Sequence, residues 1–140
     1  MMSPNMALVR CFLDEIVNGG DTRLIPELVA ADHVRHAPDG DLYGPEGVRI
    51  NLAEWRTGLP DLRVVIEDLF AGGDRVVSRF VLHGTYDGPF LGVPTTRQEV
   101  ALVGIGIDRV AGDRLAESWI YLDVLGLLRH LSPANPPEVG

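Results

Sequence analysis

Apolar residues recur at helical spacing in three segments before Pro60. The first segment covers residues 8–17 and ends at Gly19-Gly20, which suits a helix C-cap. The second covers residues 24–29, and Asp21 is a favourable N-cap for it. The third opens at Gly44-Pro45-Glu46, where proline suits the first helical position, and its apolar stripe ends before Gly58. The pattern predicts three N-terminal helices, with one short strand between the second and the third.

After Pro60 the pattern changes to that of strands, because branched apolar residues dominate and glycine–aspartate turns separate the runs. The predicted strands cover residues 62–71, 75–86, 98–110 and 114–122, and a short apolar helix covers 124–131. Helices followed by long antiparallel strands predict an α+β fold in which a curved sheet wraps over the helices and leaves an open mouth for a ligand. We expect one domain over residues 1–132 and a flexible tail over 133–140.

Composition and charge exclude several function classes. The 140 residues are 46% apolar and carry a net charge of −8, which argues against a nucleic-acid partner or an anionic membrane surface. All 12 basic residues are arginine, so chemistry that needs a lysine is excluded. The single cysteine, Cys11, needs no oxidising compartment, and neither a signal peptide nor a membrane-spanning run is apparent. We therefore expect a cytoplasmic protein.

An ordered set of short motifs runs along nearly the whole chain. They are His36-Ala37-Pro38, Gly44-Pro45-Glu46-Gly47, Pro60-Asp61-Leu62, Gly84-Thr85, the GPFLGVP segment at 88–94 with Thr95, and Trp119-x-Tyr121-x-Asp123 with its continuation to Leu131. In this order they resemble the SnoaL-like polyketide cyclase family, relatives of ketosteroid isomerase and nuclear transport factor two. The resemblance implies a cone-shaped barrel, aldol ring closure without a cofactor, a small apolar polycyclic or polyketide-like substrate, and a homodimer formed through the outer face of the sheet.

The chain departs from the true cyclases at two places. Gly104 and Gly106 stand where those cyclases carry polar side chains, including a histidine. Ser118-Trp119-Ile120 stands where they place a His-x-Asp pair, whose acid is the cyclase base. The resemblance therefore transfers the fold better than the reaction.

Asp123 is the first candidate catalytic residue. Glu117, Trp119, Tyr121 and Asp123 alternate along the last strand, so they share one face, which we expect to point inward. A carboxyl group desolvated behind two aromatic rings would have a raised pKa and could remove a proton next to a carbonyl. The alternative is that Asp123 only caps the helix that begins at Val124.

His36 is the second candidate catalytic residue, placed after the second helix and before a turn. A neutral imidazole there could donate a hydrogen bond to a developing enolate, or it could simply bond a backbone carbonyl of its loop. With His33 and three nearby aspartates it could also suggest a metal site, but no third ligand has a defined spacing, so no metal ion is expected. No cofactor is expected either.

Aromatic residues could form the walls of a pocket for a flat ring system, although each could equally be ordinary core. The candidates for substrate binding are Trp55, Phe80, Phe90, Trp119 and Tyr121, together with His83. His83 is in phase with Arg79 and Val81 on its strand, so it could line a pocket or meet a dimer partner.

Three functional hypotheses follow. The first is a cofactor-free natural-product tailoring enzyme, an isomerase or lyase that performs aldol cyclisation or isomerisation on a polyketide-like carbonyl compound. The second is a cofactor-independent hydroxylase of aromatic polyketides. The third is a small-molecule binding protein with a non-catalytic pocket.

Overall fold

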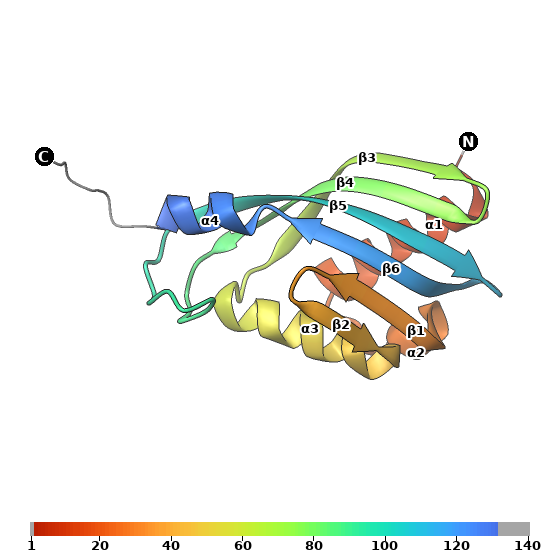
Figure 1. Cartoon of the computed structure of the whole chain (residues 1–140), viewed down its shortest axis with the longest axis horizontal. Coiled ribbons are helices and arrows are strands. Elements are labelled where there is room, and N and C mark those ends of the chain that lie inside the picture. Colours follow the sequence, from red (N-terminus) through yellow and green to blue (C-terminus); the bar gives the residue numbers. More distant parts are fainter. Residues whose placement is uncertain (1, 132–140) are drawn as a thin grey trace, which may run out of the picture.

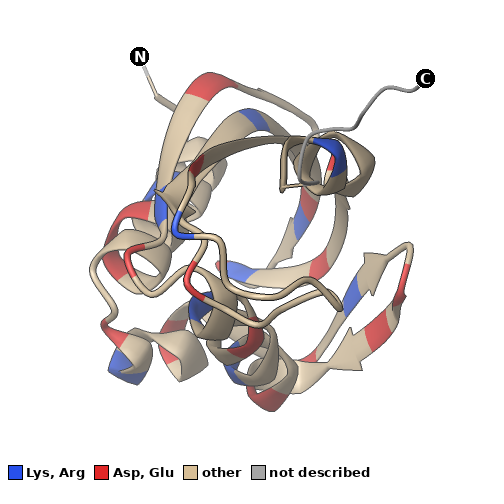
Figure 2. Cartoon of the chain, turned by 90° about the vertical axis from the view of Figure 1, so that its left-hand side faces the viewer, with Lys and Arg blue, Asp and Glu red and all other residues tan. Residues whose placement is uncertain are grey.

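The computed structural model describes residues 2–131, in which one curved sheet of six strands carries helices against its inner side (Figure 1). The predicted tail, residues 133–140, lies outside the described residues. The strand order is β2-β1-β6-β5-β4-β3, and all neighbours are antiparallel except β1 and β6, which are parallel. Figure 2, seen from the end that carries α4, shows the strands curving round in an arc that the helices complete. The α+β prediction is confirmed, with a mixed and unclosed sheet.

The first helix is anchored at both ends by side chains. Helix α1 (Pro4–Cys11) starts at Ser3, whose Oγ accepts a hydrogen bond from the Met6 N–H at 3.2 Å, and it continues as the π-helical segment η1 (Phe12–Asn18). The Asn18 side chain then donates to the Val64 carbonyl at 2.9 Å and accepts from the Val64 N–H at 2.7 Å. This pair of bonds ties the end of the helix to the sheet.

The second predicted helix is shorter than the pattern suggested. It consists of η2 (Thr22–Leu24) and α2 (Ile25–Leu28), and Val29, predicted to be helical, opens strand β1 (Val29–Ala37). Strand β1 pairs with β6 and forms a hairpin with β2 (Gly40–Tyr43), so sheet hydrogen bonds outweigh the local helical spacing. His36, expected in a loop, therefore lies on a strand.

The remaining elements lie within two residues of their predicted bounds. They are α3 (Gly44–Gly58), β3 (Arg63–Gly72), β4 (Arg75–Thr85), β5 (Glu99–Ala111), β6 (Arg114–Leu122) and α4 (Val124–Leu131). On β5 the inward positions include Gly104 and Gly106, because the side chains of Phe80, Ile120 and Leu122 occupy the space that a Cβ would need. Small residues here let β4 and β6 fill the concave side of the sheet.

Candidate functional site

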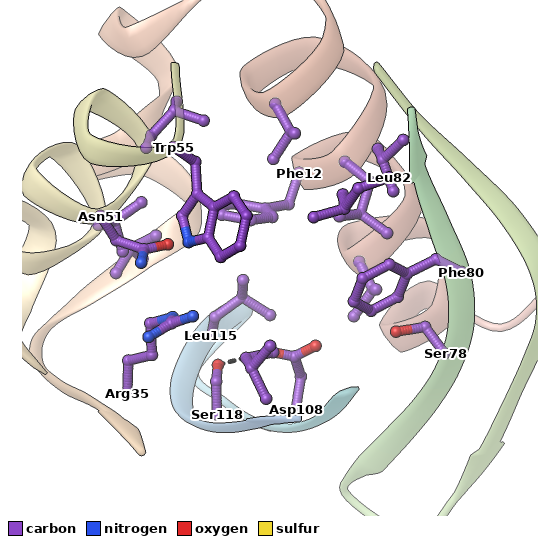
Figure 3. A pocket seen from close by; sticks show the side chains of 18 of the residues that line it. Phe12, Arg35, Asn51, Trp55, Ser78, Phe80, Leu82, Asp108, Leu115 and Ser118 are labelled. Carbon is purple, nitrogen blue, oxygen red and sulfur yellow. Dashed lines mark hydrogen bonds between the residues drawn. The ribbon is translucent and has the colours of Figure 1, made fainter. Parts of the chain in front are cut away.

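A cavity of about 130 Å³ lies between the concave face of the sheet and the helices (Figure 3). Most of its lining is apolar and comes from both hydrophobic clusters of the core. Six polar side chains interrupt this lining: His33, Arg35, Asn51, Ser78, Asp108 and Ser118. An apolar cavity with a few convergent polar groups is the usual form of a small-molecule site.

Asp108, Ser118 and His33 form a hydrogen-bonded chain across three neighbouring strands. The Ser118 hydroxyl donates to Asp108 Oδ1, its direct partner across β5 and β6, and Ser118 Oγ lies 2.9 Å from His33 Nε2 on β1. The three residues are only 8%, 5% and 3% exposed, respectively. Because Ser118 donates to Asp108, the contact with His33 requires a proton on Nε2, which leaves the buried Nδ1 as an acceptor without a partner among the described residues.

Burial moves the pKa values of Asp108 and His33 in opposite directions. Desolvation raises the pKa of Asp108 to about 6, against the lowering effect of the Ser118 hydrogen bond. Desolvation lowers the pKa of His33 to about 4, with a further contribution from the positive charge of Arg35. Near neutral pH His33 is therefore neutral. The pKa of Asp108 lies close to neutral pH, as is favourable for a general base.

Arg35, Asn51 and Trp55 line another part of the same cavity. In Figure 3, Asn51 and Trp55 project from α3 and Arg35 from β1, and the guanidinium, the amide and the indole nitrogen lie on the same side. Ser118 lies between Arg35 and Asp108 in this view. The nitrogen-bearing side chains of Arg35, Asn51 and Trp55 thus lie on one side of the cavity. The carboxyl group of Asp108 is separated from Arg35 by Ser118.

The prediction that Asp123 and His36 share the cavity is wrong. Asp123 is exposed at the start of α4, where its Oδ1 accepts a hydrogen bond from the Gly126 N–H at 2.9 Å, as in the capping alternative. His36 lies on the outer face, 2.7 Å from Glu117 Oε2 and 3.0 Å from Asp41 Oδ1, and its ring stacks on Trp119. The hydrogen bonds to both carboxylates raise the pKa of His36, with Glu117 as the larger cause.

The prediction fails because the face of β6 that we expected to point inward points outward. Ser118 and Ile120 pair directly with the inward residues Asp108 and Gly106 of β5, so the alternating set that contains Trp119 and Tyr121 points outward. Tyr121 is 58% exposed. Neither aromatic ring therefore lines the cavity, contrary to the prediction for substrate binding.

The other predicted pocket residues divide between the two faces. Trp55 and Phe80 line the cavity, as predicted. Phe90 packs edge-on against Trp55, with ring centroids 5.1 Å apart, but it is not part of the lining. His83 lies on the outer face of β4, in a shallow depression with Asp61 and Arg63. Only two of the six candidates are thus brought together in the cavity.

Sequence reasoning misses five polar residues of the cavity, namely Arg35, Asn51, Ser78, Asp108 and Ser118, and considers His33 only as a metal ligand. Asp108 is the only charged residue in its alternating set on β5, which could have signalled a buried functional group. The opposite set, however, is also largely apolar, with Val103, Ile105 and Ile107. The alternation therefore could not tell which face of β5 was inward.

Residues 2–131 contain neither a metal-binding cluster nor a membrane-spanning helix. His33 and His36 project from opposite faces of β1, and across residues 2–131 no three histidine, cysteine or acidic side chains are grouped to bind a metal ion. None of the helices in the described part of the chain has the length and hydropathy to span a bilayer.

Comparison with known proteins gives a consistent result. The family model for the SnoaL-like polyketide cyclase matches residues 7–131. A protein from Jannaschia sp. CCS1 assigned as a SnoaL-like polyketide cyclase is 28% identical, with a TM-score of 0.85 over 96% of this chain and 94% of that one. IdmH from Streptomyces antibioticus, assigned as a polyketide cyclase, is 27% identical, with a TM-score of 0.81 over 91% and 97%. AclR from Streptomyces galilaeus, assigned as a hydroxylase, is 25% identical, with a TM-score of 0.82 over 97% and 87%. No curated protein matches the chain.

Proposed function

The chain belongs to the SnoaL-like polyketide cyclase family, and from this premise we propose that it is a natural-product tailoring enzyme that performs acid–base chemistry on a polyketide-like carbonyl compound. The reaction is an aldol cyclisation or an isomerisation, and Asp108 is its base. The observation that carries the proposal is the buried Asp108 carboxyl group, hydrogen-bonded to Ser118 in an apolar cavity, with a pKa raised to about 6.

The chemistry follows from this environment. A carboxylate in an apolar cavity is a stronger base than one in water, so it can remove a proton from a carbon next to a ketone. Ser118 and His33 position the carboxylate, because the serine hydroxyl is itself bonded to the imidazole. Protonated Asp108 then returns its proton to the product. Phe80 and Trp55 provide apolar surface for the substrate rings.

Proton exchange on a model ketone tests this proposal. β-Tetralone is incubated with the protein in deuterium oxide, and the loss of its α-protons is followed by proton NMR. Asp108→Asn keeps the size of the side chain and removes the base, so exchange should fall roughly 10²–10⁴-fold. Circular dichroism verifies that the variant is folded.

Asp123→Asn is the matched control, because it changes an exposed carboxylate that caps α4. Its exchange rate should equal that of the wild type. Loss of exchange in Asp123→Asn with retention in Asp108→Asn would overturn the assignment of the base. A wild type that exchanges no faster than buffer would favour the binding-protein alternative.

A hydroxylase is the second candidate, favoured by the similarity to AclR. In that case the cavity would hold an electron-rich aromatic ring and Asp108 would remove a proton before reaction with oxygen. Oxygen consumption during turnover of an aromatic polyketide would distinguish this reaction from cyclisation, which consumes none.

We also propose a homodimer through the outer face of the sheet. Val65 on β3, Val103 and Ile105 on β5 and Tyr121 on β6 are exposed there, and the strand register places them in neighbouring rows. Exposed apolar side chains gathered on one face of a sheet are typical of an interface. Ile105→Arg should convert the dimer to a monomer in analytical ultracentrifugation, and an unchanged mass would contradict this interface. A cytoplasmic location stays a prediction.

A further inference from the structure

One wall of the cavity presents hydrogen-bond donors that have no acceptor. Asn51 and Trp55 are four residues apart on α3, so they project from the same face of the helix, and Arg35 reaches the same space from β1 (Figure 3). Within residues 2–131 no hydrogen bond or ion pair involves the side-chain nitrogens of Arg35, Asn51 or Trp55. Guanidinium, amide and indole N–H groups therefore face the same side of the cavity.

The positive charge of Arg35 is the least expected feature of this wall. Desolvation lowers its pKa, while Asp39 and Glu54 raise it only through space, without an ion pair. Asp108 forms no ion pair with Arg35 in the described part of the chain, since its carboxyl group is bonded to Ser118. An arginine remains protonated even when partly buried, so an unpaired cation faces an apolar cavity. Such a charge is unfavourable unless an anion joins it.

We propose that Arg35, Asn51 and Trp55 bind a carboxylate group of the substrate. The planar guanidinium fork matches the two oxygens of a carboxylate, and the amide and indole N–H groups can donate to the remaining lone pairs. The substrate is then a free polycyclic or polyketide-like acid whose carboxylate lies against Arg35, and whose reacting carbon lies toward Asp108. This inference rests on the proposed function only in that both place the substrate in the same cavity.

Binding of matched probes tests the inference without any turnover. β-Naphthoate and the neutral β-naphthamide have the same ring system and differ in charge, and isothermal titration calorimetry gives both dissociation constants at neutral pH. The wild type should bind the carboxylate roughly 10- to 100-fold more tightly than the amide. Arg35→Met keeps the length of the side chain without its charge, so this preference should disappear while the amide affinity stays unchanged. Asn51→Leu should reduce the preference by a smaller factor.

Arg79→Met is the charge control, because Arg79 is exposed on β4 in an ion pair with Asp68. It removes the same charge outside the cavity and should keep the full preference for the carboxylate. Retention of the amide affinity in Arg35→Met verifies that the cavity is intact. Equal binding of the two probes by the wild type, a preference that survives Arg35→Met, or no binding of the carboxylate would each overturn the inference.

Asp108→Asn separates this inference from the proposed function. If the carboxylate preference is present in Asp108→Asn and absent in Arg35→Met, the binding site stands whatever the exchange assay shows. If Asp108→Asn stops exchange but Arg35→Met leaves the preference intact, the base assignment stands and the carboxylate site is overturned.

Discussion

The two faces of the sheet carry two histidine–carboxylate arrangements of similar composition. On the inner face His33 reaches Asp108 through Ser118, and on the outer face His36 contacts Glu117 and Asp41 directly. The two histidines are three residues apart on β1, yet their pKa values move in opposite directions: to about 4 for His33 and upward for His36.

Solvent accounts for this difference. His33 is buried in an apolar wall, where its charged form loses hydration, whereas His36 keeps contact with water and gains two carboxylate partners. The inner arrangement therefore keeps a neutral imidazole beside a carboxyl group of raised pKa, which suits proton transfer. The outer arrangement forms ion pairs that hold β1 against β6. Four predictions test this contrast.

The largest expected effect is on the pH dependence of stability. The folded pKa of Asp108, about 6, lies above the ordinary aspartate pKa of 3.8, so the folded state binds the extra proton and stability falls as the pH rises between these values. The loss amounts to about 3 kcal/mol by linkage. Asp108→Asn should remove this loss of stability. The unfolding free energy of the variant, measured by urea denaturation, should therefore rise relative to that of the wild type by about 3 kcal/mol between pH 3.8 and pH 6.

His33→Gln is the opposite test. The folded pKa of His33, about 4, lies below 6.5, so this group makes stability rise with pH between those values. The two contributions oppose each other in the wild type. His33→Gln should therefore steepen the fall of stability with rising pH. Parallel curves for wild type and both variants would show that neither group has a shifted pKa.

An intermediate effect is expected from Ser118→Ala. The substitution leaves both Asp108 and His33 without the hydroxyl that they share, and should lower the unfolding free energy by about 2 kcal/mol. Ser78→Ala is the matched control, because Ser78 is buried on β4, lines the same cavity and has no side-chain hydrogen bond within the described residues. Equal losses in denaturant melts would contradict a specific role for the Ser118 network.

The smallest effect is expected on the outer face, from Glu117→Gln. Its carboxylate is the main cause of the raised pKa of His36, so the substitution should move that pKa back toward 6.5. The stabilisation from His36 is present below 6.5 and is lost as the pH rises through its folded pKa. NMR titration of the histidine rings should show His33 titrating near 4 and His36 above 6.5. Equal titration midpoints for His33 and His36 would contradict the proposed difference between the two faces of the sheet.

Specific residues show how far sequence reasoning reaches. The predicted bounds of β6 and α4 agree with the structure, because the hairpin turn at Gly112-Asp113 and the aspartate cap at Asp123 are local signals. The helical spacing predicts a helix at Val29, which is wrong, because the pairing of Val29 with β6 makes it a strand residue. Asp108 and Arg35 were not recognised as site residues, since their partners are far away in the chain.

The sequence by itself determined the order of the elements, the α+β class and the family, because these depend on residue periodicity, turns and ordered motifs. Only the tertiary structure decided which face of β6 lies inward, and with it whether Asp108 or Asp123 shares the cavity. The two alternating sets of residues on β5 are both largely apolar, so their hydropathy does not show which one is buried. The curvature of the sheet over the helices removes water from one of them. A carboxyl group acquires its chemistry from that loss of water, which no local pattern contains.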